Sequence, residues 1–242
     1  EKAAIMPSPG QAVCALQLPE PKVVLTRVAS ERQCELSFAG NAVQTPKGLE
    51  YAEWTFKAWP PGSYQKQNVA TAALACHILN RVSIPCDDAA IVRGVAACRW
   101  PGRYHWLEGE PPVLLDGAHN PHGIEALVSS LGEDPRIQGR PVHTLFSALQ
   151  DKNAALMLQI LEQRSSSLVV TPIHSRRSRT LTDLSSLSTK AEVAASVALG
   201  LRTIQQNARS DSAIVLVTGS LYHVGEALQK LTGAPGDPEL GG

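Results

Sequence analysis

The sequence lacks the features that mark membrane-spanning, secreted and nucleic-acid-binding chains. Its 242 residues carry 22 Lys plus Arg and 22 Asp plus Glu. This balance argues against nucleic acid or an acidic membrane surface as the main partner. No apolar run approaches the ~18 residues that span a bilayer, and no basic segment followed by an apolar one opens the chain as a secretory signal. We therefore expect a cytoplasmic monomer with no nucleic-acid and no membrane partner.

Cysteine is scarce, and its spacing forms no motif. The chain has 5 cysteines and no C-x-x-C pair, so neither a disulfide framework nor a zinc site is indicated. We interpret all of them as buried, reduced thiols. They are Cys14, Cys34, Cys76, Cys86 and Cys98.

Several common nucleotide-binding and catalytic motifs are also missing. The sequence has no G-x-x-x-x-G-K-[ST] phosphate loop and no Gly-Lys dipeptide. No G-x-G-x-x-G follows a strand, which disfavours a dinucleotide cofactor. No G-x-S-x-G is present, which disfavours an α/β-hydrolase.

What the sequence does contain is an alternation of strand and helix signals after residue 100. Apolar strands joined by crossover helices imply a parallel sheet covered on both faces. We predict an α/β fold with a Rossmann-like domain over 100–235, a stiff joint at Trp100–Arg103 and a loose tail over 236–242. The expected strands are 113–115, 142–146, 168–171 and 213–217, and the expected helices are 121–131, 153–164, 190–207 and 222–231.

The signals in residues 1–99 are more mixed. Three segments have strand-like content and two have helical spacing. Asn68 is a possible N-cap for the first helix. The expected strands are 22–28, 34–38 and 51–57, and the expected helices are 68–79 and 88–97.

The most informative stretch is Asp116-Gly117-Ala118-His119-Asn120-Pro121-His122. Ligands of such sheets bind outside the carboxyl ends of the strands, so Asp116 and His119 lie where chemistry is expected. A good helix start explains Asn120 and Pro121 but not the Asp and the His. A metal site built on His119 and His122 is disfavoured, because we find no third ligand.

Other strand ends supply further candidates. Thr218-Gly219-Ser220 precedes a helix whose first amides could hold an anion, although Ser220 could equally be a simple cap. Arg176, Arg177 and Arg179 could clamp a carboxylate or phosphate, or they could form a solvated loop. Gln150-Asp151-Lys152 is placed like another loop of the same edge.

Several stretches together resemble one family. In order and spacing they match signatures of folylpolyglutamate synthases and bifunctional dihydrofolate synthases, which are ATP-dependent ligases of the Mur ligase superfamily. The resemblance covers residues 1–232, with Ala4 where Gly is usual and Val69 where Ala is usual. The stretches are EKAAIM (1–6), GSYQKQNVATAAL (62–74), WPGR (100–103), LLDGAHNPHG (114–123), FSALQDKN (146–153) and VTGSLYHVGEAL (217–228).

The resemblance implies cofactors and roles for particular residues. Lys2 matches the lysine that is carbamylated in the family, which would turn an ammonium into an oxygen ligand for Mg²⁺. Asn68, Arg103 and Asp116 match positions that contact ATP. His119 and Ser220 match residues that face the cleft where glutamate and phosphate meet.

The resemblance also implies a reaction and a domain order. ATP would phosphorylate a folate or dihydropteroate carboxylate, and the amine of L-glutamate would attack the acyl phosphate. Residues 1–99 would be the end of the central ATPase domain, and 100–235 the C-terminal ligase domain. Because the chain starts at Glu1 and has no phosphate loop, we expect an inactive piece of such an enzyme. The alternative is a non-catalytic remnant that binds nucleotide or a partner. A Mur-type ligase that acts on cell-wall precursors is a weaker alternative, because we would expect a different sequence around the Asp116 turn.

Overall fold

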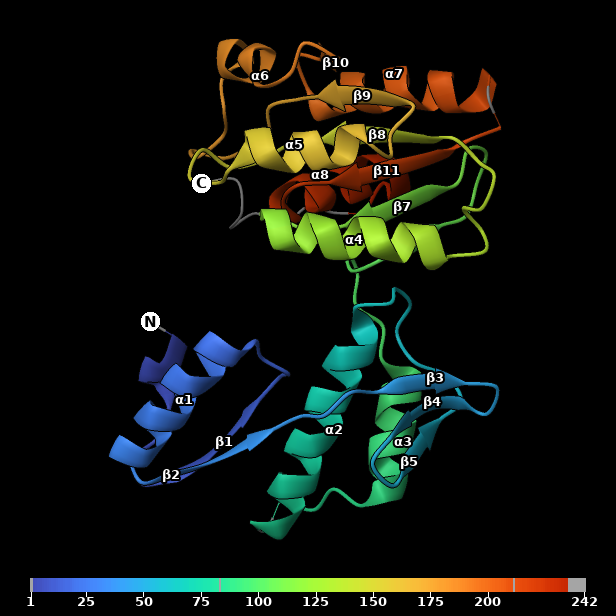
Figure 1. Cartoon of the computed structure of the whole chain (residues 1–242). Coiled ribbons are helices and arrows are strands. Elements are labelled where there is room, and N and C mark those ends of the chain that lie inside the picture. Colours follow the sequence, from blue (N-terminus) through green and yellow to red (C-terminus); the bar gives the residue numbers. More distant parts are fainter. Residues whose placement is uncertain (1, 83, 211, 235–242) are drawn as a thin grey trace. The chain divides into compact units, whose positions relative to one another are not determined.

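The computed structural model describes residues 2–82, 84–210 and 212–234, and of these the side chains of Lys2 and Ser210 are not described. The chain divides into two units, Glu1–Arg99 and Trp100–Gly242 (Figure 1). Each unit has its own sheets and its own apolar core. Among the described residues, no helix is both long enough and apolar enough to cross a membrane.

The second unit is built on a 6-stranded sheet with the order β10-β9-β8-β11-β7-β6. All neighbouring pairs are parallel except β6 with β7. The predicted α/β fold with a mostly parallel sheet is therefore confirmed. The strands are β6 (His105–Leu107), β7 (Val113–Asp116), β8 (Val142–Phe146), β9 (Ser167–Val170), β10 (Ala191–Val193) and β11 (Ile214–Thr218).

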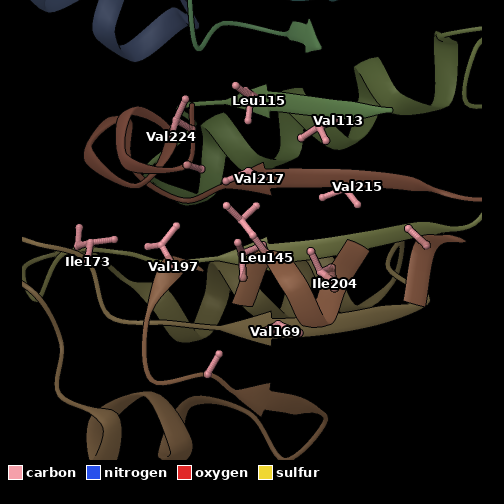
Figure 2. Close-up of a cluster of buried hydrophobic side chains, with 14 of the residues drawn as sticks. Val113, Leu115, Leu145, Val169, Ile173, Val197, Ile204, Val215, Val217 and Val224 are labelled. Carbon is pink, nitrogen blue, oxygen red and sulfur yellow. The ribbon is translucent and has the colours of Figure 1, made fainter. Parts of the chain in front are cut away.

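Helices cover both faces of this sheet (Figure 1). On one face, α7 and α8 pack on alternate strand residues to form the core cluster of Figure 2, which includes Leu115, Leu145 and Val217. On the other face, α4 and α5 lie side by side (Figure 1). The helices are α4 (Pro121–Glu133), α5 (Ala154–Glu162), α6 (Leu181–Leu187), α7 (Val197–Ser210) and α8 (Leu221–Thr232).

The strand register aligns the carboxyl ends of β7, β8 and β11. Thr218 at the end of β11 pairs with Asp116 on β7 and with Phe146 on β8. Because these strands are parallel, the segments that follow them leave the sheet at the same edge. This carboxyl edge positions the candidate site.

The first unit combines a small parallel pair with a meander. Strands β1 (Gly10–Cys14) and β2 (Cys34–Phe38) are parallel and are joined through α1 (Pro19–Glu31). Strands β3 (Val43–Thr45), β4 (Gly48–Tyr51) and β5 (Trp54–Phe56) are antiparallel. Helices α2 (Gln65–Arg81) and α3 (Asp88–Ala97) contribute to the core cluster of the meander, and a short 3-10 helix spans Lys2–Ile5.

Several local predictions for this unit are wrong. Residues 22–28 lie in helix α1, whose first turn accommodates prolines, and its Val23 is 68% exposed. The expected strand 51–57 is a hairpin that turns at Ala52, where φ is +49°. Asn68 does not cap α2, because the helix already begins at Gln65.

Two further expectations also need correction. The expected helix 190–207 is divided into β10, which pairs with β9 at the sheet edge, and α7. The five cysteines are free as predicted, but only Cys34 is buried, and the other four are partly exposed.

Candidate functional site

The candidate site is formed by loops at the carboxyl edge of the second unit's sheet. Arg103, Asp116, His119 and Ser220 all lie in or beside these loops, so the structure brings four predicted residues into one neighbourhood. Asn68 and Lys2 belong to the first unit. Asn68 is exposed on α2, where its Nδ2 donates to Gln65 Oε1 at 2.7 Å. The prediction for the Lys2 side chain falls outside the described residues.

Asp116 is buried, with only 2% of its surface exposed, and its carboxylate accepts backbone hydrogen bonds. Oδ1 accepts from the Ala118 amide at 2.9 Å, and Oδ2 accepts from the Tyr104 amide at 2.9 Å. A buried carboxylate is stable only when such donors replace water. Asp116 therefore fastens the turn after β7 to the segment that precedes β6.

Glycines let these segments approach one another closely. The Gly117 amide donates to the Gly102 carbonyl at 2.8 Å. A Cβ at Gly117 would lie 2.2 Å from Leu221 Cδ2, so a side chain there would require the Leu221 side chain to move. Gly102 has φ of +76°, a region that favours glycine. The W-P-G-R segment, the D-G-A-H turn and the start of α8 thus pack as one assembly.

Arg103 is held over this assembly. Its Nη1 donates to the Gly117 carbonyl at 3.4 Å, and the residue is only partly buried. A guanidinium has further N–H donors arranged in a fork, which suits a phosphate or carboxylate. The site therefore offers a cationic donor whose position is set by the backbone of the neighbouring turn.

His119 is oriented by the same turn. Its Nδ1 lies 2.9 Å from the Gly117 carbonyl, and because a carbonyl only accepts, Nδ1 donates this hydrogen bond. In the neutral ring this leaves Nε2 as an acceptor. Asn120 caps α4 by accepting from the Gly123 amide at 2.8 Å. Among the described residues, no third ligand joins His119 and His122 in a metal-binding group.

Ser220 sits at the start of α8 and is 2% exposed. Its Oγ accepts from the Tyr222 amide at 3.2 Å, so the hydroxyl serves as the N-cap of the helix. The preceding Gly219 has φ of +105°, and a Cβ there would lie 2.2 Å from the Ser147 carbonyl oxygen. The turn after β11 is therefore closely packed against the segment after β8.

The loops after β8 and β9 are tied together by charged groups. Arg177 pairs with Asp151, and Arg179 Nη2 donates to the carbonyls of Gln150 at 3.0 Å and Lys152 at 2.7 Å. Hydrogen bonds from Lys152 and Arg177 lower the pKa of Asp151 to about 2. These two arginines therefore hold the neighbouring loop, although Arg177 is exposed, as Arg176 is.

Sequence reasoning missed His223, which lies three residues after Ser220. His223 on α8 is 0% exposed, and neither ring nitrogen has a hydrogen-bond partner among the described residues. Burial lowers its pKa to about 4, although the nearby Leu145 backbone opposes this shift in part. His223 is therefore a neutral ring inside the core. The available signal was helical spacing, because His223 lies four residues before Ala227, which is buried on the same helix.

Comparison with known proteins defines the class of this unit. The family model described as Mur ligase, glutamate ligase domain matches residues 102–221. This range contains the loops described above, and the second unit is a glutamate ligase domain of the Mur ligase type.

The relatives define the family more narrowly. The dihydrofolate synthase/folylpolyglutamate synthase of Bacillus subtilis is 33% identical over 176 residues, which is 70% of this chain and 40% of that protein. The Escherichia coli protein of the same name is 27% identical over 95% of this chain and 54% of its own length. The chain is homologous to these synthases, whose signatures its motifs resemble.

Solved structures agree with the sequence relatives. The Escherichia coli FolC structure in complex with DHPP and ADP matches with a TM-score of 0.79 and 26% identity, over 96% of this chain and 56% of that one. The Yersinia pestis bifunctional synthase complexed with AMPPNP and Mn ion matches with a TM-score of 0.77 and 26% identity, over 95% of this chain and 55% of that one. The matches thus cover 40–56% of the lengths of these relatives.

Proposed function

We propose that this chain is the C-terminal part of an ATP-dependent ligase that joins L-glutamate to a folate or dihydropteroate carboxylate through an acyl phosphate. The observation that carries the proposal is the assembly around Arg103, Gly117 and Ser220, built from the motifs shared with the synthases. Residues 1–99 would then be the end of the ATPase domain and 100–235 the ligase domain.

The residues of the second unit suit the handling of a phosphorylated intermediate. Negative charge grows on phosphoryl oxygens during transfer, and fixed cationic donors stabilise it. Arg103 is such a donor. Asp116 would act by fixing the Arg103 segment, since its oxygens hold the Tyr104 and Ala118 amides. His119 would offer Nε2 as a hydrogen-bond acceptor to the reacting amine.

We also propose that ATP and Mg²⁺ are the cofactors, with Asn68 in the nucleotide site and carbamylated Lys2 as a metal ligand. Their support is the family resemblance and the nucleotide- and manganese-bound relatives. The metal would supply charge neutralisation at the phosphates. Whether dihydropteroate, folates or both are used is part of the test below.

A direct test uses the coding sequence extended upstream of Glu1. We expect phosphate release that requires ATP, L-glutamate and a pteroate or folate together. Arg103→Ala should lower kcat/KM by about a hundredfold or more, as for loss of a transition-state donor. Arg202 is an exposed arginine on α7. The control variant Arg202→Ala should therefore leave the rate unchanged.

The 242 residues alone should bind nucleotide weakly at most and should not ligate glutamate, because they contain no phosphate loop. Folate- and glutamate-dependent phosphate release by the isolated chain would contradict this. If the extended protein binds ATP but shows no turnover with any pteroate or folate, the alternative of a non-catalytic nucleotide-binding remnant replaces the ligase.

A further inference from the structure

A cluster of metal-ligating side chains lies in the first unit, and the candidate site uses none of its members. Glu53 lies in the turn between β4 and β5, His77 lies on α2, and Asp88 is the first residue of α3. One oxygen or nitrogen of each lies within 4.8 Å of those of the other two. Three separate elements therefore converge on one point.

A core residue supports two of these side chains. The Trp54 indole N–H donates to Asp88 Oδ1 at 3.0 Å. The Trp54 ring also meets the His77 ring edge-on, with centroids 5.5 Å apart. Trp54 is only 4% exposed and belongs to the apolar core of the meander. Outer partners of this kind orient metal ligands before the metal arrives.

The spacing of the ligand atoms suits a shared cation. His77 Nδ1 and Glu53 Oε1 are 3.7 Å apart, which is too long for a hydrogen bond. Two ligands that each lie about 2.1 Å from one tetrahedral cation are roughly 3.4 Å apart. Glu53 is exposed, so its side chain can move the small remaining distance.

We propose that Glu53, His77 and Asp88 bind a divalent transition-metal cation of the Zn²⁺ type, with water completing the coordination. Two carboxylates neutralise the cation, and the imidazole selects against Mg²⁺ and Ca²⁺, which prefer oxygen ligands. The bound cation would link the β4–β5 turn to α2 and α3. It would stabilise the first unit, and the proposal does not depend on the ligase function.

The test uses the tag-free 242-residue chain and Co²⁺ as the probe. Bound Co²⁺ should quench tryptophan fluorescence in a saturable way with about one equivalent, because Trp54 contacts His77 and Asp88. Zn²⁺ should reverse the quenching by displacement, and excess Mg²⁺ should not. Zn²⁺ should also raise the thermal unfolding midpoint.

Variants assign the site. His77→Asn and Glu53→Gln should each weaken Co²⁺ binding by about tenfold or more. The exposed Glu53 makes the second variant safe for folding. His122→Asn is the matched control, since His122 forms a similar pair with Glu125 at 3.9 Å outside any three-ligand group of the described residues. Absence of saturable quenching, displacement by Mg²⁺, or equal affinity in Glu53→Gln and the unsubstituted chain would overturn the proposal.

Discussion

At the scale of single residues, the second unit contains two buried polar side chains in opposite situations. Asp116 is surrounded by donors, whereas His223 has no hydrogen-bond partner among the described residues. The first situation favours the charged form and the second favours the neutral form. Substitutions at these two positions should therefore have opposite effects on stability.

Asp116→Asn should lower the free energy of unfolding by about 1.5–3 kcal/mol, the usual cost of losing a hydrogen bond to a charged acceptor. The new amide NH₂ would face one of two backbone N–H donors, at Tyr104 or Ala118. Urea unfolding at pH 7.5 measures the change. Asp183→Asn is a control for an exposed carboxylate and should cost less, and equal losses would show that Asp116 is not held as described.

His223 makes stability depend on pH. Its pKa falls from 6.5 to about 4 in the folded protein, so the unfolded state binds more protons between these values. Stability due to the neutral ring is complete above pH 6.5 and is lost as the pH falls toward 4, by roughly 3 kcal/mol in all.

His223→Leu should flatten this part of the profile and should be neutral or stabilising at pH 7.5, since an unpaired buried polar group is removed. Urea unfolding measured from pH 7.5 to 4 tests this expectation. His122→Leu changes an exposed ring and should leave the slope as it is. An unchanged slope in His223→Leu would refute the assignment.

At the scale of elements, the glycines of the site decide how closely the turns pack. Gly219→Ala should destabilise the chain by about 2 kcal/mol or more, because φ is +105° and the new Cβ would meet the Ser147 carbonyl oxygen. Gly225 lies within α8 with nothing within 4 Å of a Cβ. Gly225→Ala should therefore stabilise by about 0.5–1 kcal/mol. Thermal unfolding of both variants gives the comparison, and a similar sign for both would be contrary to this packing.

The elements also show which predictions the sequence supports. The parallel sheet was predictable, because apolar runs such as 214–217 are buried on both faces of the sheet and are visible in the sequence. Helix caps such as Asn120 were predictable because an Asn followed by Pro is a local signal of a helix start. The helix at residues 22–28 was not predictable, because its valines favour a strand by residue type although they are exposed on α1. The pairing of Asp116 with Tyr104 depends on folding and has no local signal.

At the scale of the whole molecule, each unit has a core made of its own residues. Leu49, Trp54 and Phe56 belong to the core of the first unit, and Leu145 and Val217 to that of the second. Separate cores can unfold in separate steps. The resemblance to the synthases was predictable from six short motifs, four of which lie in the second unit, where its loops meet.

Leu49→Ala and Gly219→Ala should accordingly act on different parts of the chain. Leu49 is 0% exposed, and its truncation should cost about 2–5 kcal/mol. Hydrogen exchange followed by mass spectrometry resolves this, because amide protection is read peptide by peptide. Leu49→Ala should speed exchange in β4, β5 and α2, and Gly219→Ala should do so in β8, β11 and α8. If either substitution raised exchange equally in both units, the two cores would unfold as one cooperative body, and the division at Arg99 would have no energetic meaning.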